Sequence, residues 1–226
     1  MNKLIILVIG LVAAYAAFTL TFPTYSYRYR LQISLSIEDK VYTGSSIIEV
    51  TWSCGPKITG LGQCSSRLGG QATVIDLGSR GVVVATLLNG ENDVSARDGA
   101  TNAQWLCANA FGRSKSNADL PFLPKLTGKR ELQSPNLPRL IWFKNPDDPA
   151  TASKVLPGDI SAAFGEPAQF AGATVEITSD PIVIDINYQL PWVQDWSAKY
   201  RSRGPLYLKS GLALSAYMFV GDPSQL

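Results

Sequence analysis

Residues Tyr27–Ile37 carry the most regular pattern of hydrophobic and polar positions in the chain. Every odd position in this segment is apolar and every even position is polar. Because successive side chains of a β-strand point to opposite faces of its sheet, strict alternation predicts a half-buried strand. Ile48–Trp52 repeats the pattern, which predicts a long antiparallel hairpin that turns at Glu38–Lys40. Gly44 and Ser45, just before the second strand, favour a bulge or bend there.

The rest of the chain predicts short strands separated by turns, with few helices. Gly78–Gly81 has the composition of a tight turn between two apolar runs. A helix is expected across Asn102–Phe111, ended by Gly112, and a shorter helix is expected after Asp159. Residues 113–138 are expected to be an irregular connection. The other expected strands are Gln71–Leu77, Val82–Leu88, Arg139–Phe143, Ala173–Ile177, Ile182–Tyr188 and Leu206–Val220.

This order of elements predicts a β-rich α+β fold. Antiparallel sheets carry one or two short helices, after an N-terminal membrane helix. Ser179–Pro181 is too short for a relaxed hairpin between its flanking strands, so we expect a bulge within one long bent strand.

The first 22 residues indicate in which cellular compartment the strand-rich domain lies. Leu4–Phe22 contains no charged side chain and approaches the roughly 20 apolar residues that a spanning helix needs. A cleaved signal peptide is the alternative, with Lys3 as its charged start and Ala14–Ala16 as its small-residue cleavage site. We therefore expect residues 1–22 to be a transmembrane anchor or signal segment. Residues 23–226 are expected to form a single β-rich domain outside the cytoplasm, since a long following domain is translocated largely regardless of its charge.

Composition excludes several classes of function. Lys plus Arg is 20 and Asp plus Glu is 18, which gives a net charge of only +2. Nucleic-acid-binding proteins usually carry a concentrated basic excess, so we expect no nucleic-acid partner. The chain contains no histidine, which excludes Ser-His-Asp and Cys-His catalysis and histidine-ligated metals. We expect no cofactor and no metal.

The chain has three cysteines. Cys54 and Cys64 flank a loop rich in glycine and proline, and their short spacing permits a disulfide in an oxidising compartment. Cys107 lies in an apolar segment with a helical pattern, so we expect a buried and inert thiol. Three scattered cysteines without histidine are a poor set of zinc ligands.

Two kinds of hydrolytic site remain open to a chain without histidine. A serine–lysine pair needs a lysine of lowered pKa beside a serine, and two paired carboxylates can act as acid and base. We favour ordinary turn and surface roles for all of these residues and assign none as catalytic. The candidate serines and lysines are Ser45, Ser46, Lys57 and Lys125. The candidate acids are Glu49, Asp147, Asp148, Glu176 and Asp185.

Aromatic and basic side chains gather near the C-terminal end of the chain. Such a mixture suits a protein contact or a membrane-interface belt. The alternative is that the tryptophans fill the core of a strand-rich domain. The residues of this candidate interaction surface are Trp192, Trp196, Tyr200, Arg201 and Arg203.

A set of short motifs spans most of the chain. They are Tyr27–Leu31, Gly44–Val50, Pro138–Phe143 with Asp147–Pro149, Pro157–Ile160 with Phe164–Gly165, Glu176–Pro181 and Leu190–Trp192. Together they resemble a group of uncharacterised bacterial proteins, mostly proteobacterial, that begin with a hydrophobic segment. The group has no known activity, so the resemblance implies a bacterial envelope setting and no particular chemistry.

We therefore expect a membrane-anchored bacterial envelope protein, single-pass in the inner membrane with its domain in the periplasm. Cleavage of the first segment would instead give a secreted or periplasmic protein. The domain is expected to bind another envelope protein or to serve as an accessory subunit of a membrane complex. The alternatives are a histidine-independent periplasmic hydrolase and a carrier of a small or lipidic ligand. A deep pocket with convergent acids would favour an enzyme, and an exposed edge or apolar patch would favour a binding module.

Overall fold

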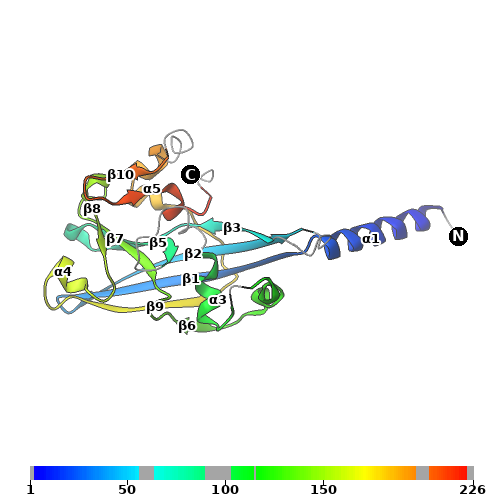
Figure 1. Ribbon diagram of the computed structural model, residues 1–226, viewed down its shortest axis with the longest axis horizontal. Coiled ribbons are helices and arrows are strands. Elements are labelled where there is room, and N and C mark those ends of the chain that lie inside the picture. Colours follow the sequence, from blue (N-terminus) through cyan, green and yellow to red (C-terminus); the bar gives the residue numbers. More distant parts are fainter. Residues whose placement is uncertain (1–2, 56–63, 90–102, 115, 197–203, 223–226) are drawn as a thin grey trace.

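A long apolar helix stands apart from the rest of the molecule (Figure 1). The computed structural model describes residues 3–55, 64–89, 103–114, 116–196 and 204–222. Helix α1 (Lys3–Thr21) is its first element, and it leads away from the end of the two longest strands. Leu4–Thr21 has the length and composition of a membrane-crossing helix, a property that anchors and signal sequences share. None of this span is buried inside the protein. Its apolar side chains therefore do not pack into the hydrophobic cores of the domain.

Strands β1 (Thr24–Ile37) and β2 (Lys40–Cys54) form the predicted hairpin. They pair antiparallel along their whole length. Glu38 and Asp39 make the two-residue turn, with φ of 49° and 61°. Positive φ at both positions is the requirement of a type I′ turn, whose twist matches that of the strands. The 14 residues of β1 extend about 45 Å at about 3.3 Å per residue.

β1 is the central strand of a five-stranded sheet in the order β3-β2-β1-β9-β6. The remaining strands are β3 (Cys64–Gly70), β6 (Lys129–Glu131) and β9 (Gln169–Ile177). One face of β1 is buried at every apolar position, which confirms the half-buried strand. This buried row consists of Tyr27, Tyr29, Leu31, Ile33, Leu35 and Ile37. The polar side chains of β1 lie on the opposite face, which we call the outer face.

A second, four-stranded sheet packs on the buried row. Its strands, in the order β4-β5-β7-β8, are β4 (Thr73–Asp76), β5 (Val82–Asn89), β7 (Pro138–Phe143) and β8 (Ala152–Val155). The two sheets approach closely where β4 meets β2, because a Cβ built on Gly44 would lie 2.1 Å from the carbonyl oxygen of Val74. The register of β2 passes Gly44 without a shift. The predicted bulge at Gly44 and Ser45 is therefore wrong, and the glycine is needed for close packing instead.

Helix α3 (Ala103–Ala110) and the 3-10 helix η2 (Asn117–Lys125) pack into the same core. α3 confirms the helix predicted in this region. The Tyr27 hydroxyl donates a hydrogen bond of 3.2 Å to the carbonyl oxygen of Gln104, which ties α3 to β1. Residues 113–138 are more regular than the sequence predicts, since they contain η2 and β6.

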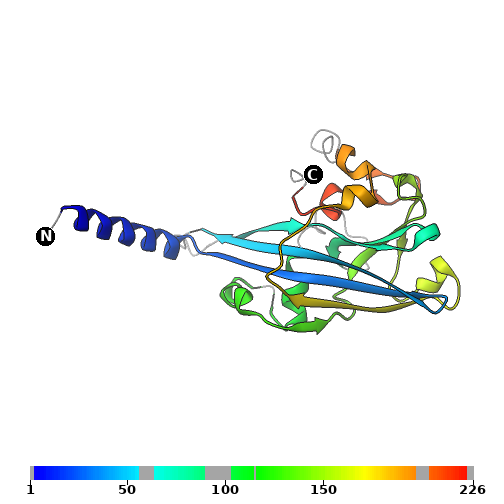
Figure 2. The same cartoon turned by 180° about the vertical axis from the view of Figure 1, so that it is seen from behind.

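The C-terminal part of the chain forms a third layer on the far side of the four-stranded sheet (Figures 1 and 2). Its side chains pack on Ile141 and Phe143 of β7 and make a second hydrophobic core. The molecule is thus a stack of two sheets and one mixed layer. The elements of that layer are α5 (Ile186–Gln189), β10 (Leu206–Tyr207), β11 (Ala213–Leu214) and the 3-10 helix η4 (Ala216–Met218).

Two strand predictions in the third layer are wrong. Ile182–Tyr188 is not a strand, because the chain is irregular before Ile186 and helical after it. Ile186, Leu190 and Val193 are fully buried; Ile186 begins α5, Leu190 follows its end, and Val193 lies in the next helical segment, residues 192–196. Leu206–Val220 holds only the two-residue strands β10 and β11 and then η4.

Residues 178–185 cross the outer face of the five-stranded sheet to reach the third layer (Figure 2). Asp180 forms an ion pair with Arg30 of β1. Ile182 lies against Gly69 of β3, with its Cδ1 atom 3.3 Å from a Cβ built on that glycine. Since β9 ends before this crossing, the predicted bulge within one long bent strand is wrong.

Three short elements occupy the remaining turns. The 3-10 turn η1 (Gly78–Arg80) joins β4 to β5 in the predicted hairpin. A second 3-10 turn, η3 (Pro149–Thr151), precedes β8. Helix α4 (Ile160–Phe164) confirms the short helix predicted after Asp159.

Replacement of Gly44 by alanine should destabilise the protein. The new methyl group would collide with the backbone of β4, which cannot move aside as a flexible side chain can. We expect Gly44→Ala to lower the free energy of unfolding by about 1–3 kcal/mol. Chemical denaturation of the full-length protein in detergent, followed by tryptophan fluorescence, measures this change. Gly158→Ala is the matched control, since a Cβ at Gly158 meets nothing within 4 Å; equal stability of the two variants would contradict the packing argument.

Candidate functional site

The structure does not bring the candidate serines and lysines together among the residues it describes. The Ser46 hydroxyl is buried and shares a 2.6 Å hydrogen bond with the hydroxyl of Thr73. Ser45 lies next to it on the outer face, and the Lys125 ammonium lies over the ring of Phe122, 5.8 Å from its centroid. The other candidate base, Lys57, lies outside the described residues. Because Ser46 belongs to β2 and Thr73 to β4, the hydrogen bond between their hydroxyls links the two sheets.

The candidate acids Glu49 and Asp185 have side-chain partners within the fold. Glu49 accepts from Arg28 at 2.6 Å on the outer face, and Glu176 lies opposite Arg30 in the register of β1 and β9. Glu49 therefore has an arginine as its ion-pair partner, and Glu176 has an arginine opposite it on the neighbouring strand. Asp185 accepts a 2.6 Å hydrogen bond from the side-chain amide of Gln71, which fastens the third layer to the end of β3.

Asp147 and Asp148 belong to a turn. The Asp148 carboxylate accepts from the backbone N–H of Ala150 at 2.9 Å and so caps η3. The backbone N–H of Asp147 donates to the side-chain oxygen of Asn145 at 3.1 Å. In the part of the chain that the structure describes, no three Cys, Asp or Glu side chains are grouped to hold a metal ion.

The three cysteines divide into a disulfide and a buried thiol. The structure joins Cys54 to Cys64, the last residue of β2 to the first of β3. This bond lies at the end of the sheet from which α1 departs. Cys107 of α3 is fully buried, and burial raises the pKa of its thiol. A buried neutral thiol is a poor nucleophile.

The two tryptophans of the predicted interaction surface lie in the third layer. The Trp192 indole N–H donates to the Pro146 carbonyl at 3.0 Å, and its ring centroid lies 5.4 Å from that of Phe219. Trp196 packs beside it at 5.7 Å. Both rings are only partly buried, so they support the second core and also reach the surface. Outside the described residues lie the other members of this surface: Tyr200, Arg201 and Arg203.

The third layer also exposes tyrosine rings. Tyr188 is 85% exposed, Tyr207 is 75% exposed and Tyr217 is 47% exposed. Tyrosine is enriched in protein interfaces because its rigid ring buries a large area while its hydroxyl stays hydrogen-bonded. The pattern of the sequence gives no separate signal for Tyr188 or Tyr217.

A cleft of about 400 Å³ lies between β3 and the C-terminal end of the third layer. Its volume is within the roughly 300–1,000 Å³ of typical ligand sites. An ion pair of 2.6 Å between Arg67 and Asp222 crosses it, and Tyr217 supplies an exposed aromatic wall. The residues that line the cleft are Ser66, Arg67, Leu68, Gln104, Tyr217, Gly221 and Asp222.

The cleft follows the backbone edge of β3. Ser66, Arg67 and Leu68 are consecutive, and consecutive side chains of a strand point to opposite faces. All three can line one cleft only if the cleft runs along the edge of the strand. Within the part of the chain that the structure describes, β3 is the terminal strand of its sheet.

The chain itself adds backbone to this edge just beyond β3. Gln71 forms an antiparallel bridge with Val220. The Gly221 N–H donates to the Gly70 carbonyl at 3.0 Å. The edge therefore pairs with an extended segment at residues 70–72. Gly221 also lies against the backbone of Leu68, and the cleft borders the same strand at Ser66–Leu68. Sequence patterns miss this site because its two sides lie about 150 positions apart in the chain.

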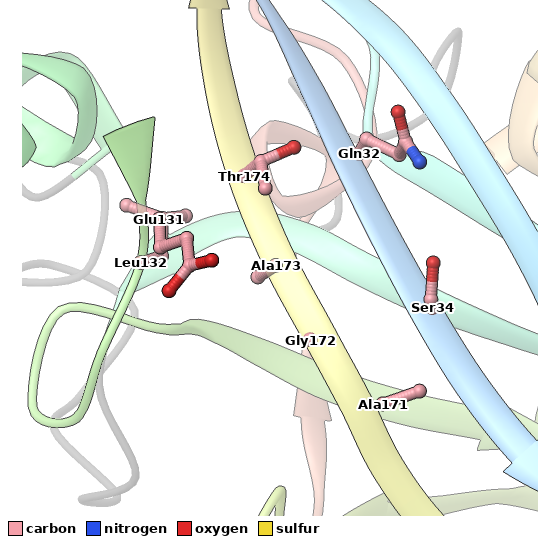
Figure 3. Close-up of a pocket in the computed structure, with 8 residues that line it drawn as sticks. All are labelled: Gln32, Ser34, Glu131, Leu132, Ala171, Gly172, Ala173 and Thr174. Carbon is pink, nitrogen blue, oxygen red and sulfur yellow. The ribbon is translucent and has the colours of Figure 1, made fainter. Parts of the chain in front are cut away.

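A second, smaller cleft of about 230 Å³ lies on the outer face (Figure 3). The register of β1 against β9 shifts after Ser34, which leaves Ala171 as the extra residue of a bulge. Gln32, Thr174 and Glu131 border the cleft from β1, β9 and β6. Its volume is below the roughly 300 Å³ at which typical ligand sites begin, so we assign it no ligand.

Comparison of the chain with family models, with curated proteins and with solved structures finds no match. The candidate site therefore depends on its geometry alone.

The reactivity of the thiols should follow their burial. At pH 8 the native, unreduced protein is expected to react with a maleimide at none of its cysteines. Denaturation without reduction should release one thiol, Cys107, and denaturation after reduction should release three. Mass spectrometry of the alkylated protein counts the modified residues, and Cys107→Ser serves as the control that removes the single thiol. Rapid native labelling of Cys107, or three thiols without reduction, would contradict this arrangement.

Proposed function

We propose that the protein is a membrane-anchored envelope protein whose domain binds an extended segment of another envelope protein in the cleft along β3. The observation that carries this proposal is the position of β3 at the end of its sheet, beside a cleft and next to an edge that already pairs with residues near the C-terminus. Strand addition to a free sheet edge is a common mode of peptide recognition, since the backbone supplies affinity and neighbouring pockets supply specificity.

The dimensions of α1 support anchoring. Its 19 residues extend about 28 Å at about 1.5 Å per residue, close to the roughly 30 Å of a bilayer's hydrocarbon core. The Cys54 N–H donates to the carbonyl oxygen of Pro23 at 3.0 Å, so strand pairing begins two residues after the helix ends. An anchored α1 would thus hold the domain next to the membrane without a flexible linker.

The disulfide supports an extracytoplasmic domain. Disulfides persist in oxidising compartments such as the bacterial periplasm and are rare in the cytosol. The Cys54–Cys64 bond, together with the N-terminal apolar helix, favours a single-pass protein of the inner membrane with its domain in the periplasm. Cleavage of α1 as a signal peptide would leave the same domain free in that compartment.

The chemistry of the cleft favours a peptide over the other candidate ligands. Arg67 and Asp222 offer both signs of charge, while Leu68 and Tyr217 offer apolar contact. A peptide backbone supplies donors and acceptors that match the edge of β3. The hydrolase and the carrier of a small or lipidic ligand remain alternatives, and no arrangement within the described residues favours either one.

Affinity purification tests the proposal. The full-length protein, isolated from native membranes in mild detergent, should retain a stoichiometric protein partner that mass spectrometry identifies. Tyr217→Ala should weaken the complex at least about tenfold, because truncation of a central interface tyrosine costs about 2 kcal/mol or more. The amount of partner recovered, measured against the wild type, gives this change.

Tyr188→Ala is the matched control. Tyr188 lies in the same layer and is more exposed than Tyr217, but it does not line the cleft. We expect this variant to retain the partner. Recovery of a monomeric protein with no partner, or an unchanged complex with Tyr217→Ala, would contradict the proposed binding at the cleft.

A further inference from the structure

Helix η2 presents two rows of side chains with opposite character. A 3-10 helix has three residues per turn, so positions three apart lie above one another. Leu120 and Leu123 form one row and are fully buried in the core. Phe122 and Lys125 form another row, and Phe122 remains 45% exposed. The first row fixes η2 to the domain, and the second row faces outward.

Two cations surround the exposed ring of Phe122. The guanidinium carbon of Arg113 lies 5.1 Å from the ring centroid and the Lys125 ammonium lies 5.8 Å from it. Both distances are within the range of cation–π attraction. Arg113 also approaches Asp119 to 3.8 Å, while Lys125 is exposed. The result is an apolar tip with positive charge at its rim, which we call the η2 tip.

Further positive charge lies beside the η2 tip. Lys129 and Arg130 begin β6, four residues after the end of η2, and the Arg130 guanidinium carbon lies 4.9 Å from the ring centroid of Phe111. Among the described residues from Arg113 to Glu131, the cations are Arg113, Lys125, Lys129 and Arg130. The acids are Asp119 and Glu131. With Lys115, which lies outside the described residues, the segment Arg113–Glu131 has a net charge of +3, although the whole chain has a net charge of only +2.

The η2 tip lies at the end of the domain from which α1 departs. The green coil of η2 occupies this end in both views (Figures 1 and 2). Helix α3 precedes η2 in the chain, and it accepts a hydrogen bond from Tyr27 near the start of β1. The opposite end of the hairpin, at Lys40 and Val41, lies far along β1 from α1.

We infer that the η2 tip contacts the anionic lipid headgroups of the membrane in which α1 is anchored. This inference rests on the anchoring part of the proposed function. Anionic lipids attract exposed lysine and arginine side chains close to the bilayer surface, and an aromatic ring beside them can enter the interfacial region. A second contact beside α1 would fix the tilt of the domain and the direction in which the β3 cleft faces. Continuity with the membrane of α1 and the local positive charge favour lipid over a protein partner at this position.

The experiment uses an environment-sensitive fluorophore on the full-length protein. Phe122→Cys is labelled with NBD and reconstituted into vesicles of phosphatidylcholine, with or without phosphatidylglycerol. Flotation separates vesicles that carry inserted protein. We expect the NBD emission at position 122 to increase and shift to shorter wavelength, more strongly with phosphatidylglycerol. Addition of Lys125→Glu should reduce this shift.

Val41→Cys is the matched control. Val41 is an apolar residue, 61% exposed, at the far end of the hairpin, and its label should keep the emission of an aqueous site. If Cys107 remains unlabelled, the variant is folded, because the thiol of Cys107 is buried in the folded protein. If Phe122→Cys does not fold, a label at Lys125→Cys on the same outward row gives the same readout.

Two results would overturn the inference and are distinguishable. If the protein floats but the label at position 122 has the same emission as the label at position 41, the η2 tip does not contact lipid. Anchoring by α1 is then still supported. Protein that does not float excludes anchoring by α1, and the inferred contact fails with it.

Discussion

The burial of the apolar row of β1 is the constraint on which the rest of the structure depends. Tyr27 to Ile37 place six apolar side chains on one face, and that face is covered by the second sheet, α3 and η2. A slip of one residue in register would turn this row outward and bury Arg28 and Arg30. Burial of two charged side chains is so costly that one register is strongly favoured. β2 and β9 pair with β1 on its two edges, so this register also positions both neighbours.

The same hairpin connects the core to the N-terminal helix. β1 starts three residues after α1 ends, and the disulfide joins β2 to β3 at this end of the sheet. The three layers then stack away from the outer face, with the third layer on the far side of β5 and β7. Residues 178–185 link the first layer to the third across the outer face. The β3 cleft lies where the edge of the first sheet meets the third layer, and both its walls are held by tertiary contacts.

The sequence predicts those elements whose pattern is local and strict. β1 alternates without exception, and α3 combines helical spacing with a glycine stop, so both are confirmed. Ile182–Tyr188 also alternates, but Ile186 is buried in the second core at the start of the short helix α5, so the alternation does not produce a strand. Local sequence around Gly44 predicts a bulge. The reason for the glycine is the close backbone of Val74 in β4, which lies 30 positions later in the chain.

The candidate site is less accessible to sequence reasoning than the fold. The sequence of β3, Cys-Ser-Ser-Arg-Leu-Gly-Gly, shows no regular alternation of apolar and polar residues. Its edge becomes a site only through Gly221 and Asp222, which reach it from the other end of the chain. The aromatic residues near the C-terminus that the sequence singles out, Trp192 and Trp196, lie in the third layer. The sequence does not separate Trp192, whose ring packs in the second core, from the more exposed Tyr217.

The location of the domain relative to the membrane is the central claim, and protease accessibility tests it most directly. Protease is added to intact cells and to spheroplasts that produce the full-length 24.4 kDa chain, and a C-terminal tag is followed by immunoblotting. We predict membrane-bound, full-length protein that is protected in intact cells and digested in spheroplasts. Protection in spheroplasts that ends only when the inner membrane is lysed would place the domain in the cytoplasm and contradict the claim.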